Sequence, residues 1–281
     1  KAIALMAGQD RPLWDFEDVG DNASRVRTEG MAPVVAVPTT AGTGSEVGRA
    51  SVITDEATRV KRIIFHPRML PAIVILDAQL TVGLPPRLTA ATGMDALSHN
   101  LEAWCSPVFH PMAAGIALEG MRLVKQWLPS AVADGRDLQA RAEMLCASAM
   151  GATAFQRGLG AMHALAHPLG AHHDAHHGTL NAVLMPYVLK ANRTAIEDRI
   201  IAAARYLDLR DASFEGFLEW LLALRSGIGI PHALSALGID GSDADEIAAM
   251  AVADPSHATN PASLTEVQYQ EIYLAAVEGA L

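Results

Sequence analysis

The chain changes character at Pro85-Pro86. Before this point, short apolar runs rich in β-branched residues are separated by Gly, Pro and Thr; these runs lie at 33–38, 62–65 and 72–76. Runs of this length are typical of buried strands. After it, Ala, Leu, Met and Glu recur with helical periodicity. The sequence therefore predicts an α/β part over 1–84, followed by an all-helical part over 85–281.

The second part predicts a series of helices at 87–105, 110–127, 136–157, 160–170, 178–192, 194–207, 213–226, 242–253 and 265–279. Asn260-Pro261, followed by Ser263 and Thr265, gives the last helix an N-terminal signal. At the other end, residues 1–7 resemble the interior of a helix that Gly8 closes as a C-cap. Because a natural chain rarely starts inside a helix, we expect the sequence to be part of a longer protein.

Composition excludes several classes of protein. Hydrophobic residues make up 51% and charged residues 19%, as in soluble globular proteins. The formal net charge of -10 disfavours nucleic acid or an anionic membrane as partner. No apolar run approaches the roughly 20 residues of a membrane span. Two cysteines, Cys105 and Cys146, do not make a disulfide framework, and we expect a reducing compartment, the cytoplasm.

Two segments carry residues suited to metal binding. Residues 93–102 read Gly-Met-Asp-Ala-Leu-Ser-His-Asn-Leu-Glu, and on a helix Asp95 and His99 project from one face. This pair can bind a divalent cation or form an exposed hydrogen-bonded pair. Residues 160–178 hold six of the eleven histidines of the chain, and imidazole is the commonest nitrogen ligand of Zn and Fe. Spacing alone nominates Asp95, His99 and the i,i+4 pair His163 and His167 as ligands.

A third segment, Pro-Thr-Thr-Ala-Gly-Thr-Gly-Ser-Glu at 38–46, follows a predicted strand. Glycine lets the backbone approach a ligand closely, and hydroxyl groups donate to phosphate or ribose oxygens. Many surface turns have the same composition, so the pattern by itself indicates either a ligand loop or a turn.

Together these segments resemble the signatures of the iron-containing (group III) alcohol dehydrogenases. The similarity covers 38–46, 93–99, and His-Ala-Leu-Ala-His-Pro-Leu-Gly at 163–170 with His177-Gly178, in the right order. It implies a dehydroquinate-synthase-like fold, in which a nucleotide-binding α/β domain precedes a helical metal-binding domain and the active site lies between them. In the family the last metal ligand lies fourteen positions after the first histidine of the second motif, which is the position of His177 here.

The resemblance therefore implies a ligand set of Asp95, His99, His163 and His177. It gives His167 the role of a non-ligating proton relay beside substrate and nicotinamide. His172, His173 and His176 match no family ligand, and we interpret them as cleft-lining or solvated.

The cofactor site implied by the resemblance comprises Thr39, Thr40 and Thr43 in the loop, Lys61 on the next strand, and Leu76 beside the adenosine. For Lys61 an ordinary surface charge is the alternative. We expect the glycine-rich phosphate loop of the family directly upstream of Lys1. The residues that distinguish NAD from NADP are expected there too.

The implied function is a metal-dependent oxidoreductase that interconverts a primary or small secondary alcohol and its aldehyde or ketone, with hydride transfer to or from NAD or NADP. The family name favours Fe²⁺, and the ligand set also suits Zn²⁺. The alternatives are a maleylacetate reductase, a glycerol dehydrogenase, or a metal-binding helical module without catalysis. Small-molecule substrates and a homodimer or higher homo-oligomer are the expected partners. Candidates to line the substrate pocket are Trp104, Phe109, His110 and Phe155.

Overall fold

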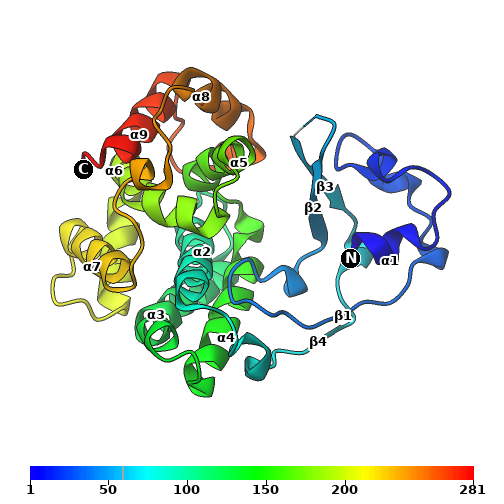
Figure 1. Ribbon diagram of the computed structural model, residues 1–281, viewed down its shortest axis with the longest axis horizontal. Coiled ribbons are helices and arrows are strands. Elements are labelled where there is room, and N and C mark those ends of the chain that lie inside the picture. The colour runs from blue at the N-terminus through cyan, green and yellow to red at the C-terminus, as the bar shows by residue number, and fades with distance from the viewer. Residues whose placement is uncertain (59) are drawn as a thin grey trace.

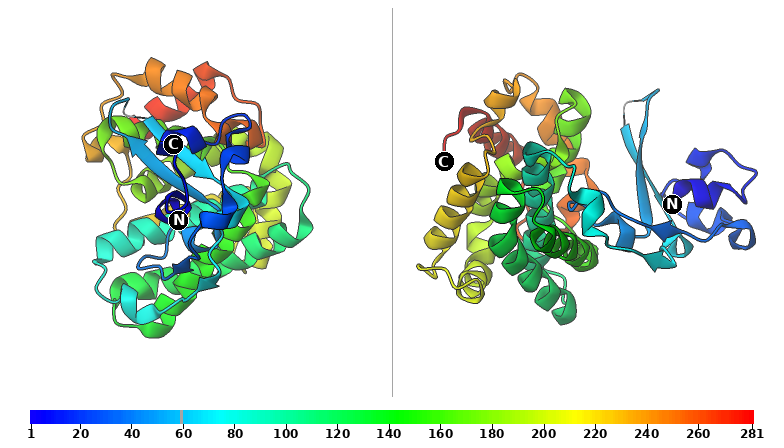
Figure 2. Two further views of the ribbon diagram at one scale, coloured as in Figure 1. Left: turned by 90° about the vertical axis from the view of Figure 1, so that its right-hand side faces the viewer. Right: turned by 60° about the horizontal axis from the view of Figure 1, so that its bottom comes forward.

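The computed structural model describes residues 1–58 and 60–281. Figure 1 shows a helical body, formed by helices α2 to α9, beside a smaller part that holds α1 and four strands. The views in Figure 2 show the same division from two further directions. Each part has its own hydrophobic core: Leu5, Phe16, Ile64 and Met69 form the small one, and a much larger cluster fills the helical body.

The strands form two separate pairs. β1 (Val35–Ala36) runs parallel to β4 (Ile73–Val74), and β2 (Ala50–Asp55) runs antiparallel to β3 (Val60–Phe65). The predicted runs at 33–38, 62–65 and 72–76 contain β1, most of β3 and β4. β2 was not predicted, because Ala-Ser-Val-Ile-Thr-Asp holds no continuous apolar run.

The expectation that the strands are buried is wrong for β1 and β4. Val35 and Ile73 expose 56% and 55% of their surface. Within the described residues no further strand flanks this pair, and one side chain of each strand, Val35 and Ile73, is exposed.

α1 (Ala2–Met6) confirms the predicted helix at the start of the sequence. Gly8 is not its C-cap, however: Ala7 takes that place in a right-handed helical conformation. A Cβ on Gly8 would lie 2.4 Å from the backbone of Gly30. The glycine therefore serves a close contact between two chain segments.

The helical body follows the predicted order of helices. Its helices are α2 (Pro86–Cys105), α3 (Pro111–Ala133), α4 (Leu138–Ala154), α5 (Ala161–His173), α6 (His177–Tyr206), α7 (Phe214–Gly227), α8 (Ala244–Ala253) and α9 (Glu266–Glu278). Proline at the first turn starts α2 and α3, where a missing N–H does no harm. Thr265 and Gln268 form a capping box at α9, which confirms the predicted N-terminal signal.

Several helix predictions need correction. The helices predicted at 110–127 and 160–170 continue to Ala133 and His173. The predicted helices at 178–192 and 194–207 are one continuous helix, α6, and the side chain of Asn192 within it bonds that of Asn260. The helix predicted at 136–157 ends earlier, at Ala154. A 3₁₀ turn (Phe155–Arg157) follows, and Gly158 then takes a φ of 106°.

α2 lies at the centre of the body. Fifteen of its 20 residues are buried, and it packs against α3, α4 and α6. The polar residues that α2 carries are therefore held inside the protein. No helix among the described residues combines the length and the apolar character needed to span a membrane.

Candidate metal centre

One face of α2 carries three buried ionisable side chains. Asp95, His99 and Glu102 expose 4%, 3% and 7% of their surface. Their spacing of four and three residues places them on successive turns of the same helix face. Burying charged groups in this way is costly unless partners are supplied, so the neighbouring helices must provide them.

α5 and α6 supply those partners. His163 projects from the first turn of α5 and is buried, while His177 is the first residue of α6 and is partly exposed. The start of α6 approaches α2 so closely that a Cβ on Gly178 would lie 2.2 Å from the carbonyl oxygen of Ala91. Glycine at this position allows His177 to reach Asp95.

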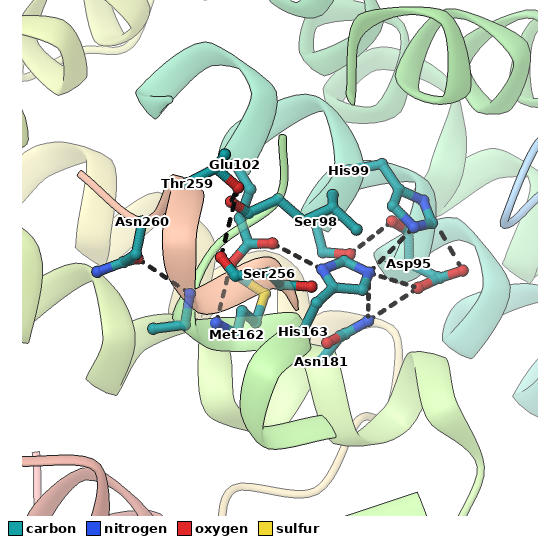
Figure 3. A network of polar contacts seen from close by, with 12 residues as sticks. Asp95, Ser98, His99, Glu102, Met162, His163, Asn181, Ser256, Thr259 and Asn260 are labelled. Atoms are coloured by element: carbon teal, nitrogen blue, oxygen red, sulfur yellow. Dashed lines mark hydrogen bonds and ion pairs between the residues drawn. The ribbon is translucent and has the colours of Figure 1, made fainter. Parts of the chain in front are cut away.

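The side chains of Asp95, His99 and His163 converge (Figure 3). Asp95, His99 and His163 each offer one ligand atom, and all three atoms lie within 4.8 Å of one another. The Nε2 atoms of His99 and His163 are 3.0 Å apart, and Asp95 Oδ1 lies 4.0 Å from His163 Nε2. His177 joins from the side of Asp95, with Nε2 3.7 Å from Oδ1, and is not within the 4.8 Å group.

This donor set fits a divalent cation. Two Nε2 atoms that face each other at 3.0 Å put lone pairs together unless a proton or cation lies between them. Around a tetrahedral ion with bonds of about 2.1 Å, ligand atoms lie about 3.4 Å apart. The separations of 3.0 to 4.0 Å found here bracket that value. Three nitrogens and one carboxylate oxygen suit Fe²⁺ or Zn²⁺.

Burial and mutual charge set the protonation that metal binding requires. Burial lowers the pKa of His163 and of His177 well below the usual range, and the neighbouring imidazoles add to this. Burial acts in the opposite sense on Asp95, but its pKa is still lowered because His99, His177 and His163 surround it. Neutral imidazoles and an ionised carboxylate are the ligating forms.

Asn181, one turn after His177 on α6, was not predicted. Its Nδ2 lies 2.9 Å from Asp95 Oδ1 and within 3.2 Å of Nε2 in both His163 and His177. The residue is fully buried. The i,i+4 spacing from His177 was visible in the sequence, but asparagine is common at many buried positions and carries no signal alone.

His167 lies beside the cluster. Its ring stacks on that of His177, with centroids 5.4 Å apart and planes within 9°. Its Nδ1 lies 2.8 Å from Asp254 Oδ2. Burial opposes ionisation of Asp254, but the contact with His167 holds its pKa below the usual value. The ionised carboxylate can only accept, so Nδ1 carries a proton, and in the neutral imidazole Nε2 then keeps a lone pair. Asp254 was also missed, since it lies 87 residues away in sequence.

The remaining histidines of the segment 160–178 lie outside the donor group. His173 Nε2 bonds Asp243 Oδ2 at 2.9 Å, and His172 lies 3.9 Å from the same oxygen. His176 is exposed at the start of α6. Of the four candidates to line the pocket, only Phe155 contacts the cluster, at 5.1 Å from the His99 ring. Trp104 packs on Arg199, Phe109 is 89% exposed, and His110 caps α3.

The glycine-rich loop packs against the helical body. A Cβ on Gly44 would lie 2.4 Å from the carbonyl oxygen of Ser148 on α4, and Ser148 Oγ donates to the Gly42 carbonyl. These glycines thus serve helix contacts, a reason the sequence did not reveal. The threonines predicted to bind cofactor, Thr39, Thr40 and Thr43, are exposed.

Of the other two predicted cofactor residues, Leu76 is 37% exposed and follows β4. Lys61 lies on β3, and burial lowers its pKa. Its Nζ is 3.4 Å from the place of a Cβ on Gly170. Lys61 therefore reaches from the smaller part to α5, the helix that carries His163 and His167.

Comparison with known families agrees with this arrangement. Residues 89–277 match the family described as "Fe-containing alcohol dehydrogenase family, C-terminal", and residues 1–78 match "Iron-containing alcohol dehydrogenase". The chain is 39% identical to a 4-hydroxybutyrate dehydrogenase of Cupriavidus necator, over 97% of this chain and 72% of that protein. It is 37% identical to a 1,3-propanediol dehydrogenase of Citrobacter freundii, over 97% and 71%.

Solved structures agree as well. A 1,3-propanediol oxidoreductase superposes with a TM-score of 0.92 and 36% identity, over 98% of this chain and 72% of that one. A sulfoacetaldehyde reductase from Bifidobacterium kashiwanohense, solved with NAD+, gives a TM-score of 0.89 and 28% identity over 98% and 72%.

The fold and the donor cluster define a metal-dependent, nicotinamide-linked oxidoreductase with the dehydroquinate-synthase-like architecture. The chain belongs to the iron-containing alcohol dehydrogenase family. The predicted family, fold class and reaction type are confirmed, and the alternatives considered from the sequence describe the chain no better.

Proposed function

We propose that Asp95, His99, His163 and His177 hold one divalent cation, Fe²⁺ or Zn²⁺, at which a primary alcohol and its aldehyde are interconverted. The convergence of these donors from three helices supports the assignment. When bound, the cation supplies Lewis acidity, which favours loss of the alcohol proton and polarises a carbonyl group.

The protein sets the charge of this site. One carboxylate and three neutral imidazoles carry a charge of −1, so the loaded site keeps a net +1. The lowered pKa values of Asp95, His163 and His177 keep those groups in their ligating forms. No strongly basic side chain is then needed at the reacting oxygen.

His167 is the proposed proton relay. Its Nδ1 is held by Asp254, and its ring lies against His177 and is 34% exposed. The free Nε2 can therefore take a proton from the site and pass it to solvent.

Cofactor binding is proposed for Thr39, Thr40, Thr43, Lys61 and Leu76. The contact of Lys61 with α5 supports this, since it brings a cation to the helix that carries His163 and His167. We accordingly propose residues 1–84 as part of the nucleotide-binding domain and 85–281 as the catalytic domain.

A primary alcohol is proposed because several relatives are named for one. They include dehydrogenases of 4-hydroxybutyrate, 1,3-propanediol and methanol. These substrates differ in size and charge, so the hydroxymethyl group is the part they share.

The test is metal analysis of the stripped and reloaded protein. Wild type is expected to bind one equivalent of Zn²⁺, and Asp95→Ala/His177→Ala little or none. A full equivalent of Zn²⁺ bound to the double variant would contradict the ligand assignment. His167→Ala is expected to keep the metal and lose turnover of primary alcohols; loss of metal in step with rate would instead make His167 a ligand.

We also propose a cytoplasmic homo-oligomer. Cys105 and Cys146 are both unpaired, as expected in a reducing compartment, and exposed Val35 and Ile73 offer apolar surface for association. Sedimentation velocity measures the assembly state, and a monomer at micromolar concentration would contradict the second part.

A further inference from the structure

Glu102 joins the metal cluster to the start of α5. Its Oε2 lies 2.6 Å from His163 Nδ1, and its Oε1 accepts from the backbone N–H of Met162 at 2.8 Å (Figure 3). The carboxyl group is 7% exposed. Burial raises the pKa of Glu102 to about 7, although backbone N–H groups at the start of α5 offset part of this.

We propose that Glu102 is a positioning residue that fixes His163 in the tautomer able to bind the cation; this inference rests on the metal site proposed above. A neutral imidazole carries one N–H, and the ionised Glu102 carboxylate, which a nearby cation favours over the protonated form, can only accept. The proton therefore sits on Nδ1, and Nε2 presents its lone pair to His99 and Asp95. A carboxylate behind a histidine ligand also raises the basicity of that ligand.

His163 differs in this respect from the other two candidate histidines. Within the described part of the chain, His99 Nδ1 and His177 Nδ1 are buried and have no hydrogen-bond partner. Only the outer nitrogen of His163 is bonded to a carboxylate. Of the three candidate histidine ligands, His163 is thus the one whose Nδ1, the nitrogen directed away from the metal site, is held by a carboxylate.

A capping role alone must be separated from this one. The N-cap of α5, Gly160, offers no side chain, and two outside residues replace it: Glu102 binds Met162 N–H, and Asn260 Oδ1 accepts from Ala161 N–H at 2.9 Å. Both residues are 7% exposed. Only Glu102 contacts His163 among these two, so Asn260 is a matched control.

Glu102→Gln preserves shape and removes one acceptor. If its amide oxygen keeps the bond to Met162, its NH₂ group faces Nδ1, and the imidazole proton moves to Nε2, where it blocks the metal. If the amide is turned the other way, its NH₂ group faces the backbone N–H of Met162, and two donors then oppose each other. Loss of such a supporting carboxylate typically weakens metal binding by about 10- to 100-fold.

The experiment uses the whole chain, stripped of metal and titrated with Zn²⁺ against a chromophoric chelator. Glu102→Gln is expected to bind Zn²⁺ about 10- to 100-fold more weakly than wild type. Asn260→Ala is expected to melt at a lower temperature and to keep its Zn²⁺ affinity within about threefold, since it removes the cap and the bonds to Asn192 and Ala262 but no contact with His163. Bound Co²⁺ should show an altered visible spectrum in Glu102→Gln alone.

The outcomes are distinguishable. If wild type binds no Zn²⁺, the metal site itself is wrong. If wild type binds and Glu102→Gln binds equally well, or Asn260→Ala loses as much affinity, the role of Glu102 is overturned while the site stands. A measurement without variants is ¹⁵N NMR of the histidine-labelled, Zn²⁺-loaded wild type. We expect His163 to be protonated on Nδ1, and protonation on Nε2 would overturn the inference.

Discussion

Asn181 shows how a single residue limits the charge of the site. Its amide nitrogen lies among three candidate ligand atoms, and it donates to Asp95 Oδ1 at 2.9 Å. A neutral amide adds no charge, so the donors keep their total of −1. Substituting a carboxylate of the same shape would bring two buried negative charges together, which is unfavourable until a cation separates them.

Asn181→Asp is therefore expected to destabilise the metal-free protein and to tighten Zn²⁺ binding. A gain of about tenfold corresponds to about 1.4 kcal/mol. Melting temperatures with and without Zn²⁺ measure both effects, with Asn181→Ala as the uncharged control. Equal metal-induced shifts in Asn181→Asp and wild type would show that the amide lies outside the electrostatic reach of the ion.

Glu46 is a buried carboxyl group outside the metal site, and its ionisation costs free energy. This last residue of the glycine-rich loop is 5% exposed, and its Oε1 is buried with no partner among the described residues. Burial raises its pKa, while its own backbone N–H and Lys1 act in the opposite sense. The folded state thus binds the proton more tightly than the unfolded state. Glu46 therefore contributes fully to the free energy of unfolding below its pKa in the unfolded state, near 4.5. This contribution is lost as the pH rises through the pKa of Glu46 in the folded state.

Glu46→Gln should consequently melt at a higher temperature than wild type at neutral pH, and the difference should shrink as pH falls toward 4.5. Thermal melts of both proteins at a series of pH values between 4 and 8 test this. The exposed Glu29→Gln supplies the control, with no pH-dependent difference expected. A difference between Glu46→Gln and wild type that does not vary with pH would contradict the argument.

At the scale of elements, sequence patterns predicted the features that depend on neighbouring residues in the chain. Helical periodicity, the change of character at Pro85-Pro86 and the signal at Thr265 gave the order of the helices and most of their ends. The i,i+4 spacing placed Asp95 and His99 on one face. What failed involved distant contacts: α6 continues past Asn192, whose side chain bonds Asn260, and Gly8 contacts Gly30.

The candidate site divides in the same way. His177 was reached through the family offset and not through helical spacing, because a break between α5 and α6 separates it from His163. Glu102 lay in view, three residues after His99, yet nothing local indicated that it faces α5. Asp254 could not be paired with His167 from sequence, since 87 residues lie between them.

The contact of α6 with α2 makes an element-scale prediction. Gly178→Ala would place a Cβ 2.2 Å from the Ala91 carbonyl oxygen and 3.1 Å from Asp95 Cβ, so α6 must move away and take His177 with it. We expect a loss of about 1–3 kcal/mol in the free energy of unfolding, together with weaker Zn²⁺ binding. Denaturant titrations and Zn²⁺ competition measure the two.

The matched control for Gly178→Ala is Gly115→Ala. Gly115 lies within α3, is exposed, and has open space where its Cβ would be. Alanine there should stabilise the helix by about 0.5–1 kcal/mol. If Gly178→Ala proves as harmless as Gly115→Ala, the close approach of the two helices does not constrain the site.

At the scale of the whole molecule, we expect the two cores to respond differently to metal. The candidate ligands come from α2, α5 and α6, which all belong to the large core, while Leu5, Phe16, Ile64 and Met69 form the small one with no candidate ligand among them. A ligand that binds only the folded state stabilises it by about 2.7 kcal/mol at 100 times its dissociation constant. Here that energy acts on three helices that the cation would join.

Removal of metal by a chelator is therefore expected to lower the melting temperature and to speed amide hydrogen exchange in α2, α5 and the first turns of α6. The hairpin of β2 and β3 has its own core contacts through Ile64 and should exchange at nearly the same rate with and without metal. Hydrogen exchange read by mass spectrometry compares the stripped and Zn²⁺-reloaded protein, and reloading should restore the protection. If protection changes as much in the hairpin as in α2, the two parts unfold as one unit, and the cation stabilises the molecule as a whole rather than the body that supplies its ligands.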